Sequence, residues 1–410
     1  MDVLYVSLLS SQFVSPILIS QGTDCMPQII KERLFTPGPT PLLMEGQART
    51  LTATLHHRTE AFKQLMNETL ENLRYFFNTK NDVLMFSSSG TGAMEGSIAN
   101  LTSPGERVLV CTAGKFGERW VELASAYGLE TVKVEAPYGQ PLSVEEIGKC
   151  LRNDGPFRAV YVQATETSTG VSHDVKAISD LVRPLPETCL VVDGITGLGT
   201  TDLRPDEWGL DVVIGGSQKA LMVPPGLAFA SVSEKAWKLI GKSKSPRYYF
   251  DFAKERKNLA KGQSSYTPAT TLVVGLHATL QYIREVGREN LIANAAMLAK
   301  ATREAAKAMG LSLFATDSPA NAVTAIKSPE GMDSGAIVKE MRSRFGAIIA
   351  NGQGTMKGKI FRLAHLGYYD ALELFAGLAG VEISLVKLGH KCELGSGVRA
   401  AQKVYMEHAG

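Results

Sequence analysis

Three polar segments of this sequence each follow an apolar, strand-like run, and each carries side chains that can do chemistry. The first, residues 87–92 (SSSGTG), follows the run VLMF and precedes a helical pattern. Small residues let the backbone approach a ligand, and a helix N-terminus offers free N–H groups to an anion. Ser89, Gly90 and Thr91 are therefore candidate phosphate ligands, although taken alone the segment also reads as a helix cap and tight turn.

The segment does not match the common nucleotide-binding fingerprints. Glu95 occupies the third glycine position of the dinucleotide fingerprint, and the next glycine, Gly96, comes one residue too late. No GK[ST] follows, so a Walker loop is excluded as well. A phosphate cradle of another kind stays open.

The other two segments supply a carboxylate and an amine. Asp193 ends the run CLVV, and Lys219 follows the run DVVIGGSQ 26 residues later. A carboxylate at a sheet edge binds a protonated ring nitrogen or a metal, or caps a helix. No His or second acid lies near it at metal-ligand spacing, so we expect no metal site. A buried lysine has a lowered pKa and forms Schiff bases with aldehydes, whereas a solvated lysine is the ordinary alternative.

Together the three segments indicate more than any one of them. A phosphate cradle, an acidic partner for a pyridine nitrogen and a lysine for an aldehyde are what pyridoxal phosphate requires. The combination therefore predicts a pyridoxal-phosphate site at neighbouring strand ends.

The surrounding elements can bring these strand ends together. Between about residues 50 and 240, helical patterns alternate with short apolar runs. Such runs are typical of strands buried on both faces of a parallel sheet, where ligands bind at the carboxyl ends. The predicted strands are residues 83–88, 107–112, 131–135, 159–164, 190–193, 211–215 and 227–232, and the predicted helices include 60–77, 92–101 and 117–127. The fold class is therefore α/β, with a large, doubly wound, mostly parallel sheet.

A second pattern begins near Thr271 and predicts a smaller C-terminal α+β domain. Its helices are expected at residues 271–286 and 289–309, and its strands at 322–326, 347–350 and 360–364. We divide the chain into an extension (1–25), a large cofactor-binding domain with an N-terminal arm (26–285) and a small domain (286–410). The extension contains no Lys or Arg, unlike a presequence, and we expect it to be poorly ordered or not translated, with Met26 as the start.

Composition excludes several other classes of protein. The chain has 410 residues, of which 44% are hydrophobic, and its net charge is +2. Whole-chain disorder is excluded, and without a basic excess we expect no nucleic-acid partner. The five cysteines contain no CxxC pair, which argues against a disulfide framework or a zinc site. No segment is long and apolar enough to span a bilayer, so the sequence predicts a cytoplasmic protein without a membrane partner.

Eight segments carry a resemblance to a known family. They are TPGPTP (36–41), HHRTEAF (56–62), SSGTGAME (88–95), ETSTG (166–170), VDGITGLG (192–199), GSQKAL (216–221), SYTPAT (265–270) and FRLAHLG (361–367). With them the sequence resembles the class V aminotransferases, pyridoxal-phosphate enzymes of fold type I. It is most similar to their alanine–glyoxylate, serine–glyoxylate and serine–pyruvate branch. The match runs from Phe35 to about Gly380, and GSQKAL with its upstream VDGI is the most specific part.

The resemblance implies a catalytic role for several residues. Lys219 would hold the cofactor as an aldimine and then move a proton between the substrate Cα and the cofactor. Asp193 would keep the ring nitrogen protonated. Arg362 would bind the substrate carboxylate through its planar fork, and Gly38, between two prolines, would line a small substrate pocket.

Other residues of the matched motifs would hold the cofactor. The phosphate would be bound by Ser89, Gly90, Thr91 and Gln218, the 3-oxygen of the ring by Thr167, and the ring face by Phe116, where relatives often have Trp. Thr267 would reach the phosphate of the neighbouring subunit's cofactor, which implies a homodimer. Ser264 stands where relatives often place Tyr or Thr, so we carry no phosphate role over to it.

The resemblance implies a ping-pong transamination between a small amino acid, alanine or serine, and a small 2-oxo acid, glyoxylate or pyruvate. A phosphonate or phosphoserine transaminase is an alternative, but we place no additional cation in the pocket that would favour it. Cysteine desulfurase chemistry would need a mobile cysteine near the site, and Cys392 is the only late one. A non-catalytic subunit of a larger complex would have no need of Lys219, Asp193 and Arg362. The sequence does not select the preferred donor and acceptor.

Overall fold

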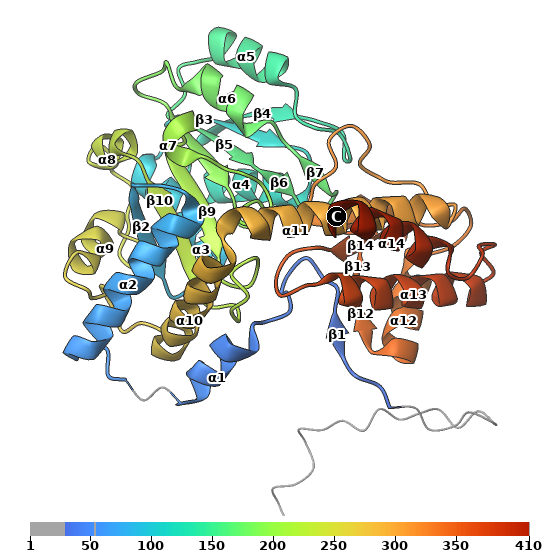
Figure 1. The fold of residues 1–410 in the computed structure, drawn as a ribbon. Coiled ribbons are helices and arrows are strands. Elements are labelled where there is room, and N and C mark those ends of the chain that lie inside the picture. Colours follow the sequence, from blue (N-terminus) through green and yellow to red (C-terminus); the bar gives the residue numbers. More distant parts are fainter. Residues whose placement is uncertain (1–28, 53–54, 410) are drawn as a thin grey trace, which may run out of the picture.

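A computed structural model describes residues 29–52 and 55–409 of the chain. Its elements form two groups, one built on a large sheet and one on smaller sheets (Figure 1). The expectation for residues 1–25 lies outside the described residues.

The large sheet has seven strands in the order β2 (Asp82–Phe86), β10 (Ala228–Val232), β9 (Val212–Gly216), β8 (Cys189–Asp193), β5 (Ala159–Gln163), β3 (Arg107–Thr112) and β4 (Glu130–Glu135). Strand β10 is antiparallel to both of its neighbours, and all other pairs are parallel. The inner strands β5, β8, β9 and β10 are buried along their whole length, which explains their unbroken apolar sequences. The predicted mostly parallel α/β sheet is confirmed.

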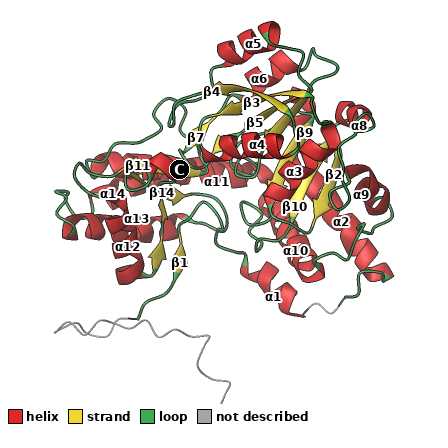
Figure 2. Cartoon of the chain, turned by 180° about the vertical axis from the view of Figure 1, so that it is seen from behind, coloured by secondary structure: helices red, strands yellow, loops and turns green. Residues whose placement is uncertain are grey.

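Helices pack on both faces of this sheet, as the opposite views of Figures 1 and 2 show. They are α2 (Glu60–Phe77), α3 (Gly90–Leu101), α4 (Lys115–Ala126), α5 (Val144–Asn153), α6 (Val175–Val182), α7 (Pro205–Trp208), α8 (Glu234–Ile240), α9 (Phe252–Leu259) and α10 (Thr270–Val286), with α1 (Met44–Thr52) lying against α10. Several begin at a side chain that accepts a backbone N–H, such as Thr59 for α2 and Asp251 for α9. A short hairpin, β6 (Thr165–Glu166) and β7 (Val171–Ser172), follows β5.

The second group surrounds a three-stranded antiparallel sheet of β11 (Val323–Lys327), β14 (Ile360–Ala364) and β13 (Ala350–Asn351). Its helices are α11 (Arg288–Ala308), α12 (Ser334–Phe345), α13 (Ala371–Lys387) and α14 (Ser396–Ala409), with a 3₁₀ turn at Gly354–Met356. The expected strand at 347–350 is two strands, because β12 (Ala347–Ile348) pairs instead with β1 (Arg33–Leu34) of the N-terminal arm.

Two separate hydrophobic clusters accompany these two groups. One joins buried residues from Leu43 to Ile283, and the other joins Phe35 to residues between Leu298 and Val404. The arm therefore crosses from the second cluster to the first between Phe35 and Leu43, and Gly38 and Pro39 in this crossing line the candidate site. The domain boundary at 285/286 stays a prediction.

Candidate active site

The carboxyl ends of β2, β5, β8 and β9 lead into one cavity of about 340 Å³. The register explains this convergence, because Asp193 at the end of β8 lies opposite Gln163 of β5 and Ile214 of β9. The sequence-predicted residues that line the cavity are Gly38, Ser89, Gly90, Thr91, Phe116, Thr167, Asp193, Gln218 and Lys219. Residues up to 181 positions apart, from Gly38 to Lys219, thus share one site, and only Arg362 and Thr267 of the predicted set are not among its lining residues.

The first turn of α3 forms one wall of the cavity. Ser89 is its N-cap residue, yet its hydroxyl makes no capping hydrogen bond to the helix. Gly90 leaves no room for a side chain, because an added Cβ would collide with Ile195. The buried Oε1 of Gln218 also has no hydrogen-bond partner in the structure. The uncapped N–H groups of a helix N-terminus and the unused Ser89 hydroxyl are donors that fit a phosphate group, and Gln218 would contribute to it through its amide NH₂.

Asp193 presents a buried carboxylate to the same cavity. Its side chain is 5% exposed, and Oδ1 accepts a hydrogen bond of 2.9 Å from the backbone N–H of Ile195. The pKa of Asp193 is raised to about 6, mainly by burial; the Ile195 N–H, Lys219 and Arg119 oppose this rise, and the charge of Glu166 contributes to it. A carboxylate held in this state is well suited to pair with a protonated ring nitrogen, which would restore the lost solvation.

Lys219 follows β9 and is 9% exposed. Its Nζ donates a hydrogen bond to the carbonyl of Pro37, and a Cβ added at Gly38 would collide with Nζ. Burial lowers the pKa of Lys219 to about 8, Arg362 and Arg119 add to the effect, and Asp193 opposes it. The neutral amine that attacks an aldehyde is therefore more accessible than in a solvated lysine.

Arg362 lies on β14 and is 3% exposed. Two backbone carbonyls hold its guanidinium: Nη1 donates to Thr167 at 2.9 Å, and Nη2 donates to Asn351 at 2.7 Å. No carboxylate among the described residues forms an ion pair with it. Burial lowers the pKa of Arg362 to about 10, and Glu166 opposes this change. The structure thus brings a buried cation without a carboxylate partner close enough to Lys219 to influence its pKa.

Thr267, like Arg362, does not line the cavity, and it lies in a different part of the fold. It is exposed and lies between α9 and α10, beside Ser264 and Tyr266. Its predicted role concerns a neighbouring subunit and stays a prediction.

Two charged residues near the cavity were not identified from the sequence. Arg119 lines it, with its guanidinium carbon 5.0 Å from the centre of the Phe116 ring and Nη1 3.2 Å from the Thr91 hydroxyl. The expectation that no additional cation enters the pocket was therefore wrong. Arg119 comes one helical turn after Phe116, a spacing that places both on one helix face and could have revealed it. The second residue, Glu166, accepts backbone N–H groups at the start of α4.

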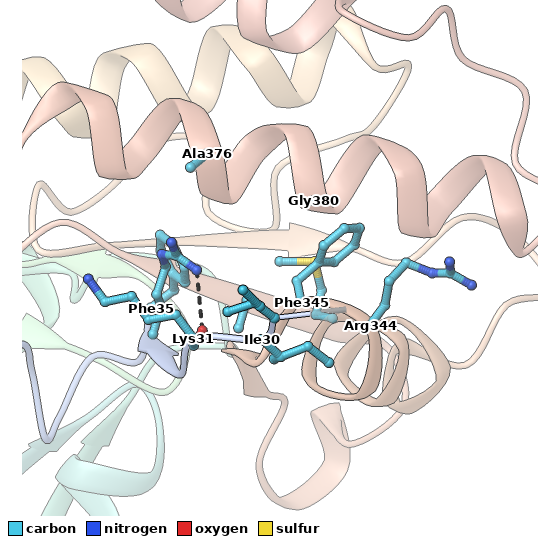
Figure 3. A pocket seen from close by; sticks show the side chains of 11 residues that line it. Ile30, Lys31, Phe35, Arg344, Phe345, Ala376 and Gly380 are labelled. Carbon is cyan, nitrogen blue, oxygen red and sulfur yellow. Dashed lines mark hydrogen bonds between the residues drawn. The ribbon is translucent and has the colours of Figure 1, made fainter. Parts of the chain in front are cut away.

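Several other candidates lie outside the site. His365 is buried with Nε2 2.9 Å from the Thr324 hydroxyl, and Cys392 packs against the second cluster. Neither lines the cavity. A separate hollow of about 430 Å³ lies between β1, α12 and α13 (Figure 3), and it contains none of the predicted site residues.

The fold and the site define a pyridoxal-phosphate-dependent enzyme of the α/β type. The class-V aminotransferase family matches residues 43–368, and the chain belongs to this family. It is a transaminase with pyridoxal phosphate as its cofactor. Transaminases of this family act on an amino acid and a 2-oxo acid.

Three curated relatives match almost their whole length. The chain is 41% identical over 379 residues to the soluble hydrogenase 42 kDa subunit of Anabaena cylindrica, covering 92% of this chain and 99% of that protein. It is 34% identical to the L-aspartate–glyoxylate aminotransferase of Paracoccus denitrificans, with 91% and 96% covered. It is also 34% identical to the serine–glyoxylate aminotransferase of Methylorubrum extorquens, with 92% and 97% covered.

A solved structure is also similar. The ureidoglycine–glyoxylate aminotransferase of Bacillus subtilis superposes with a TM-score of 0.88 at 29% identity, covering 94% of this chain and all of that chain. Within the described part of the chain, no helix has the length and apolar character needed to cross a bilayer. The same residues hold no cluster of three or more His, Cys, Asp or Glu that could bind a metal ion.

Proposed function

We propose that this enzyme transfers the amino group of alanine or serine to glyoxylate or pyruvate in a ping-pong cycle. The observation that carries the proposal is the single cavity that joins Lys219, Asp193 and the first turn of α3, with Arg362 nearby. Glyoxylate also recurs in the names of the relatives and of the similar structure.

The residues divide the work as follows. The first turn of α3 and Gln218 would bind the phosphate, Asp193 would pair with the ring nitrogen, and Thr167 and Phe116 would hold the ring. When bound, the cofactor supplies an electron sink that stabilises negative charge on the substrate Cα. Lys219 would hold the cofactor through its aldehyde and, as a neutral amine, would move the proton at the substrate Cα. Its lowered pKa near 8 keeps a useful fraction of the amine neutral at physiological pH.

The substrate end of the cavity favours small carboxylates. Arg362 is the buried cation that binds the carboxylate shared by amino acid and 2-oxo acid, so both half-reactions use one group. Gly38 and Pro39 line the cavity, and the close approach of Gly38 to Lys219 leaves little room there for a long side chain.

We further propose that the enzyme is a homodimer in which Thr267 contacts the phosphate bound by the neighbouring subunit. In support, Thr267 is exposed on a segment anchored beside the phosphate loop, where the backbone N–H of Ala269 donates 3.1 Å to the Ser87 hydroxyl.

A half-reaction screen tests the proposed substrates. The holoenzyme is mixed with each of the twenty amino acids, and the loss of its visible band at about 400–430 nm is followed. We expect a response confined to alanine, serine and glycine, and recovery of the band with glyoxylate or pyruvate. A response confined to phosphorylated or aromatic donors would overturn the proposal.

An acidic donor is a second candidate, and Arg119 is the observation that favours it. Its guanidinium lines the cavity and is bound to the Thr91 hydroxyl rather than to a carboxylate. The aspartate named for the Paracoccus relative is a donor of this class. In the same screen, a response to aspartate that is lost in Arg119→Gln would select this candidate.

The name of the Anabaena relative raises the alternative of a non-catalytic subunit. The conjunction of Lys219, Asp193 and an unpaired Arg362 in one site argues against it, because a scaffold needs none of them. Purification of a colourless protein with unrelated chains would favour it.

A further inference from the structure

Glu166 is a buried carboxylate beside the cavity that the roles above do not use. It ends β6, is fully buried (0% exposed), and forms no ion pair with Lys or Arg among the described residues. Its oxygens accept hydrogen bonds instead. Oε2 accepts from the backbone N–H groups of Phe116 (3.1 Å) and Gly117 (3.0 Å), and Oε1 accepts from the N–H (3.1 Å) and hydroxyl (2.5 Å) of Ser168. A buried carboxylate persists only when it is satisfied in this way.

Glu166 acts as the missing cap of α4. The N-cap residue of that helix, Gly114, has no side chain to accept its free N–H groups. A Cβ at Gly114 would lie 2.6 Å from Cγ and Cδ of Glu166, so the glycine makes room for the carboxylate. The positive end of the helix dipole favours the ionised form. Phe116 stands in this first turn, so the carboxylate determines where its ring stands.

The residue after Glu166 contacts Arg362, the proposed carboxylate-binding residue. The next residue, Thr167, accepts the Arg362 Nη1 hydrogen bond at its carbonyl, and its hydroxyl lies 2.9 Å from that of Thr196. One residue therefore joins the helix that carries Phe116 to the backbone that holds Arg362. This link spans 50 residues of sequence between Glu166 and Phe116.

The charge of Glu166 also reaches two charged groups of the site, Asp193 and Arg362. The titratable groups that face it are Asp193 at the end of β8, Arg362 on β14 and Tyr138 after β4. Its negative charge raises the pKa of Arg362, which burial lowers, and also raises the pKa of Asp193. The pKa of Glu166 itself is raised, because burial outweighs the hydrogen bonds from Ser168, Gly117 and Phe116 that lower it.

We propose that Glu166 is a positioning residue of the transamination site: its ionised carboxylate fixes Phe116 relative to Thr167 and Arg362 and supplies negative charge to the cavity. This inference rests on the proposed function, because it assigns the residue that aligns the cofactor-binding and carboxylate-binding halves of that site.

Two variants separate the charge of Glu166 from its position. Glu166→Gln keeps the size but removes the charge and turns an NH₂ group toward N–H donors, so we expect KM for both substrates to rise about tenfold. We also expect the pH midpoint of the visible band of the lysine-bound cofactor to fall by about one unit, because a nearby negative charge is lost. Glu166→Asp keeps the charge, so its midpoint should remain that of the wild type while KM rises.

Glu118→Gln is the matched control. Glu118 is in the first turn of the same helix, but it pairs with Lys115 at 2.5 Å and Tyr138 rather than with the Phe116 amide. Its replacement removes a carboxylate from the same helix end, and we expect KM and the pH midpoint to stay unchanged.

An unshifted midpoint in folded Glu166→Gln would overturn the proposal, because a merely structural cap loses stability without moving that midpoint. If Glu166→Gln does not fold, Gly114→Ala provides the test, since its Cβ displaces the carboxylate and leaves the charge. A raised KM with an unshifted midpoint supports the proposal, and an unchanged KM contradicts it. The midpoint is measured without an amino acid, so the result is independent of whether alanine or serine is the true donor.

Discussion

The active-site cavity and the hollow of Figure 3 have similar volumes, about 340 and 430 Å³, but different chemistry. The cavity contains opposite charges, Asp193 and Lys219, that are both buried. The hollow is lined largely by apolar side chains such as Phe35, Met341 and Phe345. Of its three cations, Lys31 is exposed, Arg33 is half-buried and donates to the Lys31 carbonyl at 3.2 Å, and Arg344 pairs with Glu340 at 2.5 Å.

The difference shows that volume alone does not mark a reactive site. In the cavity, burial shifts the pKa of Asp193 to about 6 and that of Lys219 to about 8, so both move toward neutral pH. Groups displaced in this way exchange protons readily under physiological conditions. The hollow has no buried pair of opposite charges of this kind, because its cations are exposed, half-buried or paired with Glu340.

The largest expected effect is that of Lys219→Ala. We expect the visible band to disappear and turnover to fall to the background rate, because no other amine lines the cavity among its described residues. Absorption spectra and turnover measure this, with circular dichroism as the check that the variant folds. Full activity in the folded variant would refute the mechanism.

Met341→Ala in the hollow should lower stability without changing catalysis. Met341 is fully buried in the second cluster, so its truncation should lower the free energy of unfolding by about 2–5 kcal/mol. Below the unfolding transition, kcat and KM should equal those of the wild type. Denaturant unfolding and steady-state kinetics together test this, and a large rise in KM would show that the hollow communicates with the site.

Arg362→Lys tests the carboxylate pocket. The substitution keeps a positive charge but loses the planar fork, so we expect KM for both substrates to rise by about 10–100-fold. The corresponding change in the hollow, Arg344→Lys, is the control and should leave both KM values unchanged. An equal change in KM for Arg362→Lys and Arg344→Lys would contradict the assignment of substrate binding to Arg362.

The pH dependence of the cofactor-free protein gives the smallest expected effect. The folded-state pKa of Lys219, about 8, is below its ordinary value of 10.5, so between these values the unfolded chain binds more protons. Stability from this group therefore rises as pH increases from 8 to 10.5, by about 1–3 kcal/mol. Unfolding curves of the wild type and Lys219→Met across this range test the sign, because the variant lacks the contribution. A wild-type stability that falls relative to the variant would contradict it.

Local patterns were sufficient for most elements of the fold. The predicted helix at 60–77 and the strands at 107–112 and 360–364 match α2, β3 and β14 residue for residue. Each is bounded by a cap, turn or charge that acts over a few residues. The direction of β10 was not predictable, because its run AFASV is buried on both faces like its parallel neighbours. The division of residues 347–350 likewise depends on the distant β1.

The site residues that directly follow a strand could be predicted from the sequence. Lys219 and Asp193 follow apolar runs, and the parallel order of β8 and β9 is enough to make them neighbours. Arg119 and Glu166 were missed because nothing adjacent to them in sequence requires their charge.

The sequence by itself determined the sheet, the order of its strand-end residues and the membership of the family, since these depend on local burial patterns and short motifs. Only the tertiary structure decided which charged side chains lie together in one buried site. Burial, and contacts such as that between the Glu166 carboxylate and the start of α4, join residues tens to hundreds of positions apart, and the resulting pKa values belong to the folded molecule rather than to any segment of it.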